Sequence, residues 1–302
     1  MEEAIKELKK LKVKKLFIQY PEGIKLRIQD ISKKIEENGI DTIISIEPCY
    51  GACDIREDEA KKLGCDTILH IGHEKFIQKT KMPVVYWEYF IEEDALPILE
   101  KDFEKIKQFK KIGLITSIQF VHSIPKVKNF LEKKGKEVFV HNALQHPGQV
   151  LGCNLEAAKK IEGNIDCFLC ISAGKFYGLG IVLITDKSVL CLDLERKEIY
   201  SLDELKKKIQ KIIAWNKASL KDAKKVGILV SWKKGQMRAD PFEIKKELKR
   251  KGKEVYVFAM DEITPEKLEG LKLDALVSLA CPRIGIDDLE RYKIPVVNWD
   301  YG

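Results

Sequence analysis

Short apolar runs that follow paired lysines recur three times along the chain, at Lys14–Tyr20, Lys110–Thr116 and Lys224–Val230. A continuous apolar run of this length, bounded by charged residues, predicts a buried strand of a parallel sheet. An amphipathic stretch with helical periodicity follows each run and ends near Gly39, Gly135 or Gly252. Because glycine directly after the last turn is a typical helix end, we expect a strand and then a helix in every repeat.

Each repeat also contains further apolar runs that predict strands. The second strands are expected at Asp41–Ser45, Lys136–Val140 and Lys253–Val257, and the third at Asp66–His70, Asp166–Cys170 and Asp274–Ser278. Repeats one and three close with a fourth run, at Pro83–Trp87 and Pro295–Trp299. Alternating strands and helices imply right-handed crossovers between parallel strands and layered α/β sheets.

The first strands of successive repeats lie about 100 residues apart, which is the size of a domain rather than of a solenoid repeat. We therefore predict an α/β fold of three similar Rossmann-like domains with parallel sheets, covering residues 1–105, 106–220 and 221–302 in a pseudo-threefold arrangement around a central cluster. Residues 92–109 and 201–222 are the expected helical connectors. A likeness of composition alone, common among βαβ proteins, is the alternative, but the matching order and spacing favour a true repeat.

Composition narrows the class of protein. Of the 302 residues, 45% are hydrophobic and 33% are charged, which excludes a disordered chain, and no apolar run is long enough to span a bilayer. The charged N-terminal stretch carries no secretory signal, so we expect a cytoplasmic protein without a membrane partner. The net charge of +7 comes from lysines dispersed among glutamates, which is typical of a solvated surface. It would also favour an acidic partner or an anionic substrate.

Eight cysteines are present, at positions 49, 53, 65, 153, 167, 170, 191 and 281. Without an export signal, a metal, cluster or redox role is a better explanation for so many thiols than a disulfide framework. For any one of them a buried core thiol is the alternative, because free cysteine packs as a small hydrophobe.

One cysteine of each repeat follows a predicted strand. Cys53 and Cys153 follow second strands at similar offsets, and Cys281 follows the third strand of the last repeat. Ligands of parallel sheets gather at the carboxyl ends of the strands, so these three thiolates could converge. Three thiolates bind three irons of a [4Fe–4S] cluster and leave the fourth iron open. A zinc ion on the same ligands is the alternative metal site.

The other cysteines are weaker candidates. Cys167 and Cys170 are three residues apart inside a predicted strand, so their side chains point to opposite faces and cannot share a metal. We expect both to be core thiols. Cys49 could be a spare ligand, and Cys65 and Cys191 are expected to fill space beside strands.

Several motifs of the chain together resemble those of one known family. The segments Gly51–Asp54, Gly152–Asn154 and Ala280–Arg283, the last followed by Asp287 and Asp288, resemble the archaeal diphthamide synthase subunit, which is the 2-(3-amino-3-carboxypropyl)histidine synthase of diphthamide biosynthesis. Tyr20–Gly23, His70–His73 and Gly235–Gln236 match as well. The resemblance extends from about Phe17 to Trp299, with the motifs in the same order.

The resemblance implies a homodimer in which the three domains each give one cysteine to a central [4Fe–4S] cluster. It also implies that the reduced cluster cleaves S-adenosylmethionine between sulfur and the γ-carbon. The resulting 3-amino-3-carboxypropyl radical adds to a histidine of translation elongation factor 2, the first step of diphthamide biosynthesis, and methylthioadenosine is released. An electron donor is required and is not identified by the sequence; no direct nucleic-acid partner is expected.

Other residues of these motifs are candidates for substrate contacts. Arg283 is placed to bind the carboxylate of S-adenosylmethionine, with an ion pair to Asp287 or Asp288 as the alternative. Gly235 and Gln236 could offer hydrogen-bond donors to the same ligand, with a helix N-cap as the alternative. Asp287 is included among the substrate-binding candidates.

The histidines divide into two groups. His70 and His73 end a strand, where they could contact the substrate or the residues around the cluster. His122, His141 and His146 are expected on the surface or in loops. The segment Gly174–Tyr177 departs from the family pattern, because Tyr177 stands where a histidine is expected.

Two other functions remain open at this stage. Quinolinate synthase also has three domains and an open-iron cluster, but it uses the iron as a Lewis acid, and the motifs Ala280–Arg283 and Gly235–Gln236 argue against it. A non-catalytic redox or scaffold protein is the third possibility. No Gly-x-Gly-x-x-Gly or Walker loop is present, which argues against a Rossmann methyltransferase or a nucleotide hydrolase.

Overall fold

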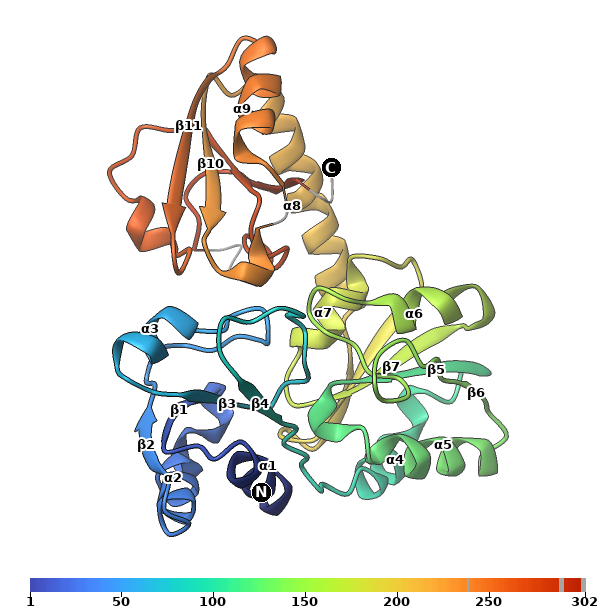
Figure 1. Cartoon of the computed structure of the whole chain (residues 1–302). Coiled ribbons are helices and arrows are strands. Elements are labelled where there is room, and N and C mark those ends of the chain that lie inside the picture. The colour runs from blue at the N-terminus through green and yellow to red at the C-terminus, as the bar shows by residue number, and fades with distance from the viewer. Residues whose placement is uncertain (238, 288–290, 300–302) are drawn as a thin grey trace. The chain divides into compact units, whose positions relative to one another are not determined.

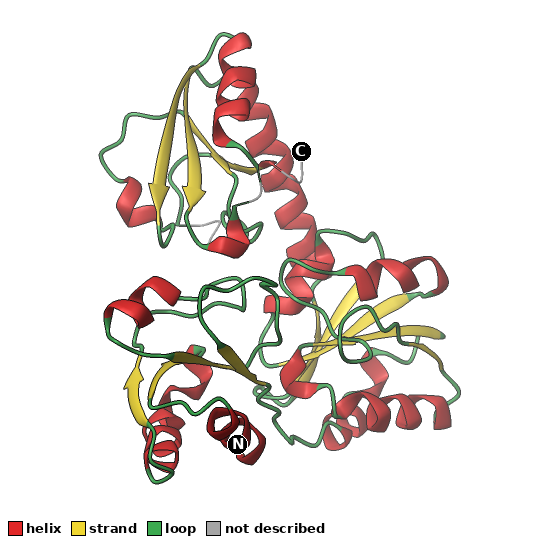
Figure 2. Cartoon of the chain, viewed as in Figure 1, coloured by secondary structure: helices red, strands yellow, loops and turns green. Residues whose placement is uncertain are grey.

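Three sheets form from the three predicted repeats (Figures 1 and 2). The structure is a computed structural model, and it describes residues 1–237, 239–287 and 291–299. The first strand of each repeat lies between the second and third strands, giving the order 2-1-3 at the centre of every sheet. This confirms the expected α/β fold of similar, mainly parallel sheets.

The first sheet is parallel throughout, in the order β2-β1-β3-β4. Alternate residues of β1 point to opposite faces: Leu16 and Ile18 pack with the helices α1 and α2, whereas Phe17 packs on the side of α3. The result is a three-layer unit. Its elements are α1 (Glu2–Lys10), β1 (Lys15–Gln19), α2 (Ile28–Glu36), β2 (Asp41–Ile44), α3 (Glu57–Lys62), β3 (Thr67–Ile71) and β4 (Val84–Trp87).

The second sheet has the order β6-β5-β7-β8-β9, with β9 antiparallel to β8. Neither β8 nor β9 was predicted; β8 takes the place that β4 and β13 have in the other sheets, and β9 is an addition. Helices cover both faces, α4 and α5 on one and α6 and α7 on the other. The elements are α4 (Leu96–Lys101), β5 (Lys111–Thr116), α5 (Ser123–Lys133), β6 (Glu137–Phe139), α6 (Glu156–Ile161), β7 (Cys167–Ser172), α7 (Phe176–Val182), β8 (Ser188–Asp193) and β9 (Glu198–Ser201).

The third sheet repeats the parallel order of the first, as β11-β10-β12-β13. The long helix α8 (Asp203–Asp222) contacts β8 of the second sheet and also β12 and β13 of the third. The other elements are β10 (Lys225–Ser231), α9 (Pro241–Arg250), β11 (Glu254–Met260), β12 (Ala275–Ser278) and β13 (Val296–Asn298). Short 3₁₀ turns occur at Glu22–Arg27, Phe103–Lys105, Ile118–Phe120, Glu162–Asn164, Lys234–Gln236 and Pro265–Leu268.

The expected helical connectors are partly present. Residues 201–222 form α8 almost as predicted, whereas residues 92–109 contain only the short helix α4 and one 3₁₀ turn. The glycines after α2, α5 and α9, namely Gly39, Gly135 and Gly252, all have a φ of +79°. This left-handed conformation is accessible to glycine at little cost, so the predicted helix ends are confirmed.

A side chain that the sequence analysis did not single out also recurs in all three repeats. The residue before each third strand is an aspartate, and its carboxylate accepts hydrogen bonds from two successive backbone N–H groups at the start of the first strand. The aspartates are Asp66, Asp166 and Asp274. The repeat is therefore visible in hydrogen bonds as well as in strand order.

The chain forms two compact units. The first comprises residues 1–90 together with 233–236, and the second comprises 91–232 and 237–302, of which 238, 288–290 and 300–302 lie outside the described residues. Each of the three sheets falls inside one of the ranges 1–105, 106–220 and 221–302. The division into three domains at those boundaries stays a prediction.

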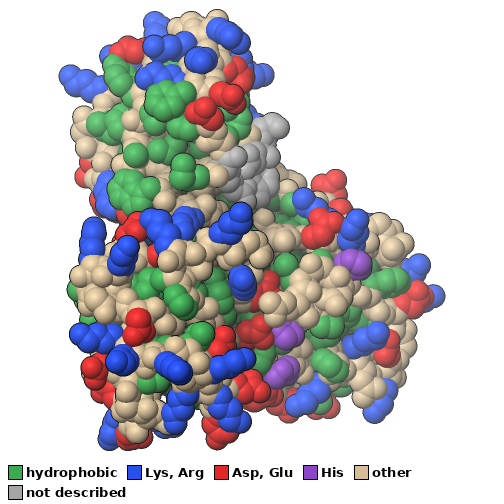
Figure 3. Space-filling view, viewed as in Figure 1, with side chains coloured by type: hydrophobic (Ala, Val, Ile, Leu, Met, Phe, Trp, Pro, Cys, Tyr) green, Lys and Arg blue, Asp and Glu red, His purple; other side chains and the backbone are tan. Residues whose placement is uncertain are grey.

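The surface carries both signs of charge. On the face seen in Figure 3, lysine and arginine side chains are interspersed with aspartate and glutamate, as expected for a solvated surface. Within the described part of the chain, no helix combines the length and the apolar character that crossing a membrane requires.

Candidate metal centre

The eight cysteines differ in burial. Cys53, Cys153 and Cys281 are partly exposed, and the other five are buried. The three partly exposed thiols are the ones that the sequence predicts as cluster ligands, and each follows a strand of a different sheet: β2, β6 and β12. A cofactor can reach a partly exposed thiol without unfolding the core, so burial separates these three cysteines from the rest.

Cys53 lies in a loop of the first unit that is held by the segment 233–236. The Gln236 side-chain amide donates a hydrogen bond to the Cys53 Sγ at 3.6 Å, and the Gly235 N–H donates to the Cys53 carbonyl oxygen at 3.0 Å. The expected hydrogen-bond donors of Gly235 and Gln236 are therefore present, and in this structure they contact Cys53. The N-cap alternative is wrong, because α9 begins later and is capped by Asp240.

Gly235 allows this close approach because it has no side chain. A Cβ at this position would lie 2.3 Å from the Cβ and 2.6 Å from the Cα of Cys53. Backbone atoms cannot move out of the way as a flexible side chain can, so any other residue would push the Cys53 loop away. This glycine is required by packing, not by a left-handed backbone.

Two ion pairs also hold the segment 233–236 against the loop of Cys53. The Lys233 ammonium contacts the Asp54 carboxylate at 2.5 Å, and both side chains are only 4% exposed. Lys234 pairs with the buried carboxylate of Glu57. Removing one partner of a buried ion pair leaves an uncompensated charge in the interior, so these contacts fix the loop strongly.

In the second unit, the loops of Cys153 and Cys281 meet on one aromatic ring. The Arg283 guanidinium lies over the Phe176 ring, 4.2 Å from its centre, which is cation–π geometry. The same ring packs so closely on Gly152 that a Cβ there would lie 2.7 Å from it. Gly152 directly precedes Cys153 and Arg283 follows Cys281 by two residues, so Phe176 joins the two loops.

Arg283 is itself a buried side chain, 5% exposed. Its Nε donates to Asp287 at 3.0 Å, and its Nη2 donates to the second oxygen of the same carboxylate. The ion pair with Asp287 is thus present; Asp288, the other candidate, lies outside the described residues. The Arg283 Nη1 is buried, and it has no hydrogen-bond partner among the residues that the structure describes. Binding of a carboxylate by Arg283 stays a prediction, with Nη1 as the available donor.

Tyr177, which stands where the family pattern has a histidine, lies beside this group. Burial raises the pKa of Tyr177 to about 12, with further contributions from Cys170 and Cys153 that raise it and from Arg283 that lowers it. The phenol is therefore neutral at physiological pH. It contributes a hydroxyl close to Cys153 and Arg283, where an imidazole could have accepted a proton.

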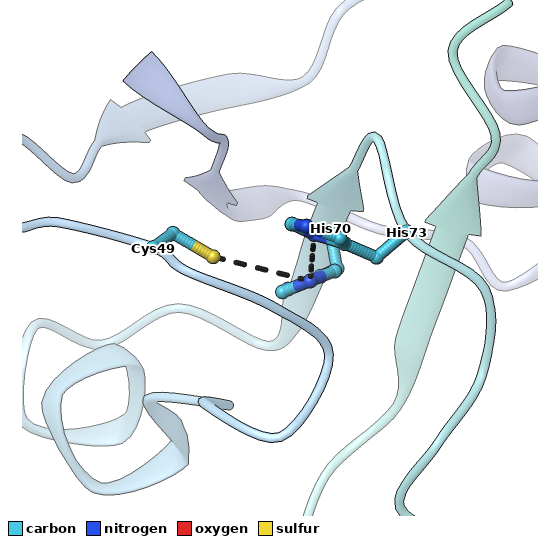
Figure 4. A group of neighbouring side chains, drawn as sticks. All are labelled: Cys49, His70 and His73. Atoms are coloured by element: carbon cyan, nitrogen blue, oxygen red, sulfur yellow. Dashed lines mark hydrogen bonds between the residues drawn. The ribbon is translucent and has the colours of Figure 1, made fainter. Parts of the chain in front are cut away.

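Cys49, His70 and His73 form a compact group in the first unit (Figure 4). The His70 Nε2 lies 3.0 Å from the His73 Nδ1 and 3.9 Å from the Cys49 Sγ. Burial lowers the pKa of His70, and it lowers that of His73 to about 4, so both imidazoles are neutral at physiological pH. Burial, with a smaller contribution from Asp54, raises the pKa of Cys49 to about 12.

The remaining cysteines are in the cores. Cys167 and Cys170 of β7 belong to the cores on opposite faces of the second sheet, as their spacing predicts. Cys65 and Cys191 are buried as well, although Cys191 lies within β8 rather than beside a strand. Of the other histidines, His122 is exposed at the start of α5, and His141 and His146 lie in the loop after β6.

The sequence analysis missed three contributors to this region. Phe176 joins two cysteine loops, and Lys233 pairs with Asp54 next to Cys53. The grouping of Cys49 with His70 and His73 was also missed, although each was a weak candidate by itself. The one available signal was position, because Cys49 and His73 follow β2 and β3, the two strands that flank β1 in one parallel sheet.

Comparison with known proteins places these observations in a family. Residues 20–299 match the family described as "Putative diphthamide synthesis protein". The 2-(3-amino-3-carboxypropyl)histidine synthase of Pyrococcus horikoshii is 36% identical over 98% of this chain and 86% of its own length. The enzyme of the same name from Methanocaldococcus jannaschii is 32% identical, with the same coverage.

A solved structure is similar over nearly the whole chain. The crystal structure of Dph2 from Pyrococcus horikoshii with a 4Fe-4S cluster has a TM-score of 0.87 and 34% identity, and the match covers 98% of this chain and 87% of that one. Eukaryotic relatives, among them that of Schizosaccharomyces pombe, are named subunit 1 of the same synthase. The chain therefore belongs to the diphthamide synthesis protein family, a family of 2-(3-amino-3-carboxypropyl)histidine synthases.

Proposed function

We propose that this chain transfers the 3-amino-3-carboxypropyl group from S-adenosylmethionine to a histidine of translation elongation factor 2, using a [4Fe–4S] cluster on Cys53, Cys153 and Cys281. The reaction is the first step of diphthamide biosynthesis. One observation carries the proposal: of eight cysteines, those three are the partly exposed ones, and each follows a strand of a different sheet. The likeness to a cluster-containing Dph2 over 98% of this chain supports it.

The residues present fit such a cluster. Iron–sulfur clusters are bound by thiolates, and three thiolates leave one iron without a protein ligand. The loop of Cys53 is held by Gly235, Gln236 and the Lys233–Asp54 ion pair, and the loops of Cys153 and Cys281 are joined through Phe176. Both arrangements fix thiols that are still accessible.

When bound, the cluster would supply the electron that breaks the bond between the sulfonium sulfur and the γ-carbon. The side chains around it have supporting roles. The Gln236 amide donates a hydrogen bond to the Cys53 sulfur, and hydrogen bonds of this kind tune cluster potentials. The Arg283 Nη1, which has no hydrogen-bond partner among the described residues, would hold the carboxylate of the methionine moiety, while Asp287 and Phe176 keep the guanidinium in place.

We also propose that the active species is a homodimer and that an external reductant supplies the electron. Because the protein substrate acts on ribosomes, the reaction is proposed to take place in the cytoplasm. The net charge of +7 is compatible with docking of a protein through an acidic surface.

The test is a reaction with protein purified and reduced without oxygen, S-adenosylmethionine and elongation factor 2. We expect methylthioadenosine and a gain in mass of the factor. A factor whose target histidine is replaced is the control and should gain no mass. If quinolinate instead forms from iminoaspartate and dihydroxyacetone phosphate, the chain is a quinolinate synthase. If neither reaction occurs with a fully loaded cluster, the proposal is wrong and a redox or scaffold role remains.

A further inference from the structure

The group of Cys49, His70 and His73 brings three metal-ligand atoms together at one edge of the first sheet (Figure 4). The Sγ of Cys49 and one ring nitrogen of each histidine all lie within 4.8 Å of one another. His70 belongs to β3, and the other two residues lie in the loops after β2 and β3. The elements of the sheet therefore hold this group, and no long surface side chain contributes to it.

The distances are close to those between the ligands of a tetrahedral zinc ion. With zinc–nitrogen bonds of about 2.05 Å and zinc–sulfur bonds of about 2.3 Å, two nitrogen ligands are about 3.3 Å apart and a nitrogen and a sulfur about 3.5 Å apart. The corresponding distances here are 3.0 Å between His70 and His73 and 3.9 Å between His70 and Cys49. Shifts of a few tenths of an ångström would bring these two pairs to the ideal values.

The group is poorly satisfied by its own hydrogen bonds. Cys49 is 5% exposed and His70 is fully buried. The His70 Nε2 and the His73 Nδ1 face each other, and only one proton can lie between them. The contacts of the Cys49 sulfur are long: 3.9 Å to the His70 Nε2 and 4.0 Å to the carbonyl oxygen of Gly51. Buried polar atoms normally have good partners, and a cation at the centre would satisfy all three lone pairs.

We propose that Cys49, His70 and His73 bind one divalent transition-metal ion, for which Zn²⁺ is the best match, at a site separate from the proposed cluster. Imidazole nitrogen and cysteine thiolate are both ordinary zinc ligands, and three protein ligands leave one position for water. Cys49 precedes Cys53 by four residues in the same loop, so the ion would tie this loop to the end of β3. That bracing role rests on the proposed function, but the metal site itself does not.

The test uses the full chain with Cys53, Cys153 and Cys281 replaced by alanine, so that metal cannot bind to those thiols. Titration with Co²⁺ under anaerobic conditions should give one bound ion with the visible bands of tetrahedral cobalt and a thiolate-to-cobalt charge-transfer band. Zn²⁺ should abolish these bands. In the same background Cys49→Ser should remove the charge-transfer band, and His73→Ala should weaken binding by at least about 100-fold, the upper range for loss of an outer-shell partner.

Cys65→Ser is the matched control, because Cys65 is also buried in the first unit but lies in the core on the α3 side of the sheet. It should keep the cobalt bands. The proposal is overturned if no cobalt binds, or if the charge-transfer band persists in Cys49→Ser. Circular dichroism confirms folding, and if Cys49→Ser does not fold, His73→Ala at the partly exposed position decides. Cluster assembly in the unsubstituted chain is measured separately, so failure of the proposed function and failure of this site are distinguishable.

Discussion

The N–H of Gly235 donates a hydrogen bond to the carbonyl oxygen of Cys53, at a contact too close for any side chain on residue 235. The two residues are far apart in the sequence. The accessible thiol of the first unit therefore depends on a segment that follows β10, a strand of the third sheet.

Gly235→Ala tests this dependence. The added methyl group would overlap the Cys53 backbone, so we expect a loss of stability of about 1–3 kcal/mol, as for overpacking of a core. Iron and sulfide content per chain should fall with it. Urea unfolding and anaerobic iron and sulfide assays measure the two effects. Gly163→Ala is the control, because a Cβ there meets no atom within 4 Å; equal iron content in the two variants would refute the prediction.

Replacement of single cysteines tests the ligand set. Cys281→Ala should abolish the brown colour of the anaerobic protein or leave an unstable cluster, because only two thiolates would remain. Cys170→Ala should keep the colour, since Cys170 is fully buried within β7. Visible absorption and EPR of the reduced proteins make the comparison. An unchanged spectrum of Cys281→Ala would remove this residue from the ligands.

Arg283→Ala is expected to keep the cluster and to weaken binding of S-adenosylmethionine by at least ~1.5 kcal/mol, the value of a charge-assisted hydrogen bond. This corresponds to about a tenfold loss of affinity, measurable by isothermal titration calorimetry. Asp287→Asn is the matched variant, because it leaves the guanidinium in place and removes only one of the two oxygens that accept from it, so it should lose less affinity. Unaltered affinity in Arg283→Ala would exclude a contact between this side chain and the ligand.

The repeated aspartate makes stability depend on pH. Hydrogen bonds from the backbone N–H groups of Lys111 and Lys110 lower the pKa of Asp166 below 3.8, and those of Lys225 and Lys224 do the same for Asp274. A carboxyl whose pKa is lower in the folded state stabilises that state above the pKa of the unfolded chain. This stabilisation is lost as the pH falls through the lower, folded value.

We therefore expect the urea midpoint of the iron-free protein to fall when the pH drops below about 4. Asp166→Ala should lower the midpoint at pH 7, and the difference from the unsubstituted protein should shrink in acid. The exposed Asp186 is a control position, and Asp186→Ala should leave the midpoint unchanged. A difference for Asp166→Ala that stays constant with pH would contradict this explanation.

Much of the fold could be predicted because its strands and helix ends follow from local sequence patterns, namely apolar runs and glycines. The apolar runs at Lys14, Lys110 and Lys224 and the glycines that end the helices recur in the same order with similar spacing, and each gave the correct element. The strand β9 was missed because the described parts of repeats one and three contain no counterpart of it, whereas β8 is the counterpart of β4 and β13 and was overlooked. The connector at residues 92–109 was overestimated because its helical periodicity is interrupted after Lys101.

The candidate site could be predicted only in part, for a physical reason. Residues at strand ends can be assigned to the edge of a sheet from the sequence, which is how Cys53, Cys153 and Cys281 were found. The partners of such residues depend on packing between distant segments. Neither the stacking of Arg283 on Phe176 nor the pairing of Lys233 with Asp54 has a periodic signal in the sequence.

The ion pairs of Lys233 and Lys234 have a consequence for synthesis of the chain. A nascent polypeptide that has reached only residue 90 already contains Asp54 and Glu57, but their lysine partners have not yet been translated. Until residues 233–236 emerge, the N-terminal part lacks these two lysine contacts, although Asp54 can still contact Arg56 of the same segment. Residues 1–90 expressed by themselves would lack both lysine contacts permanently.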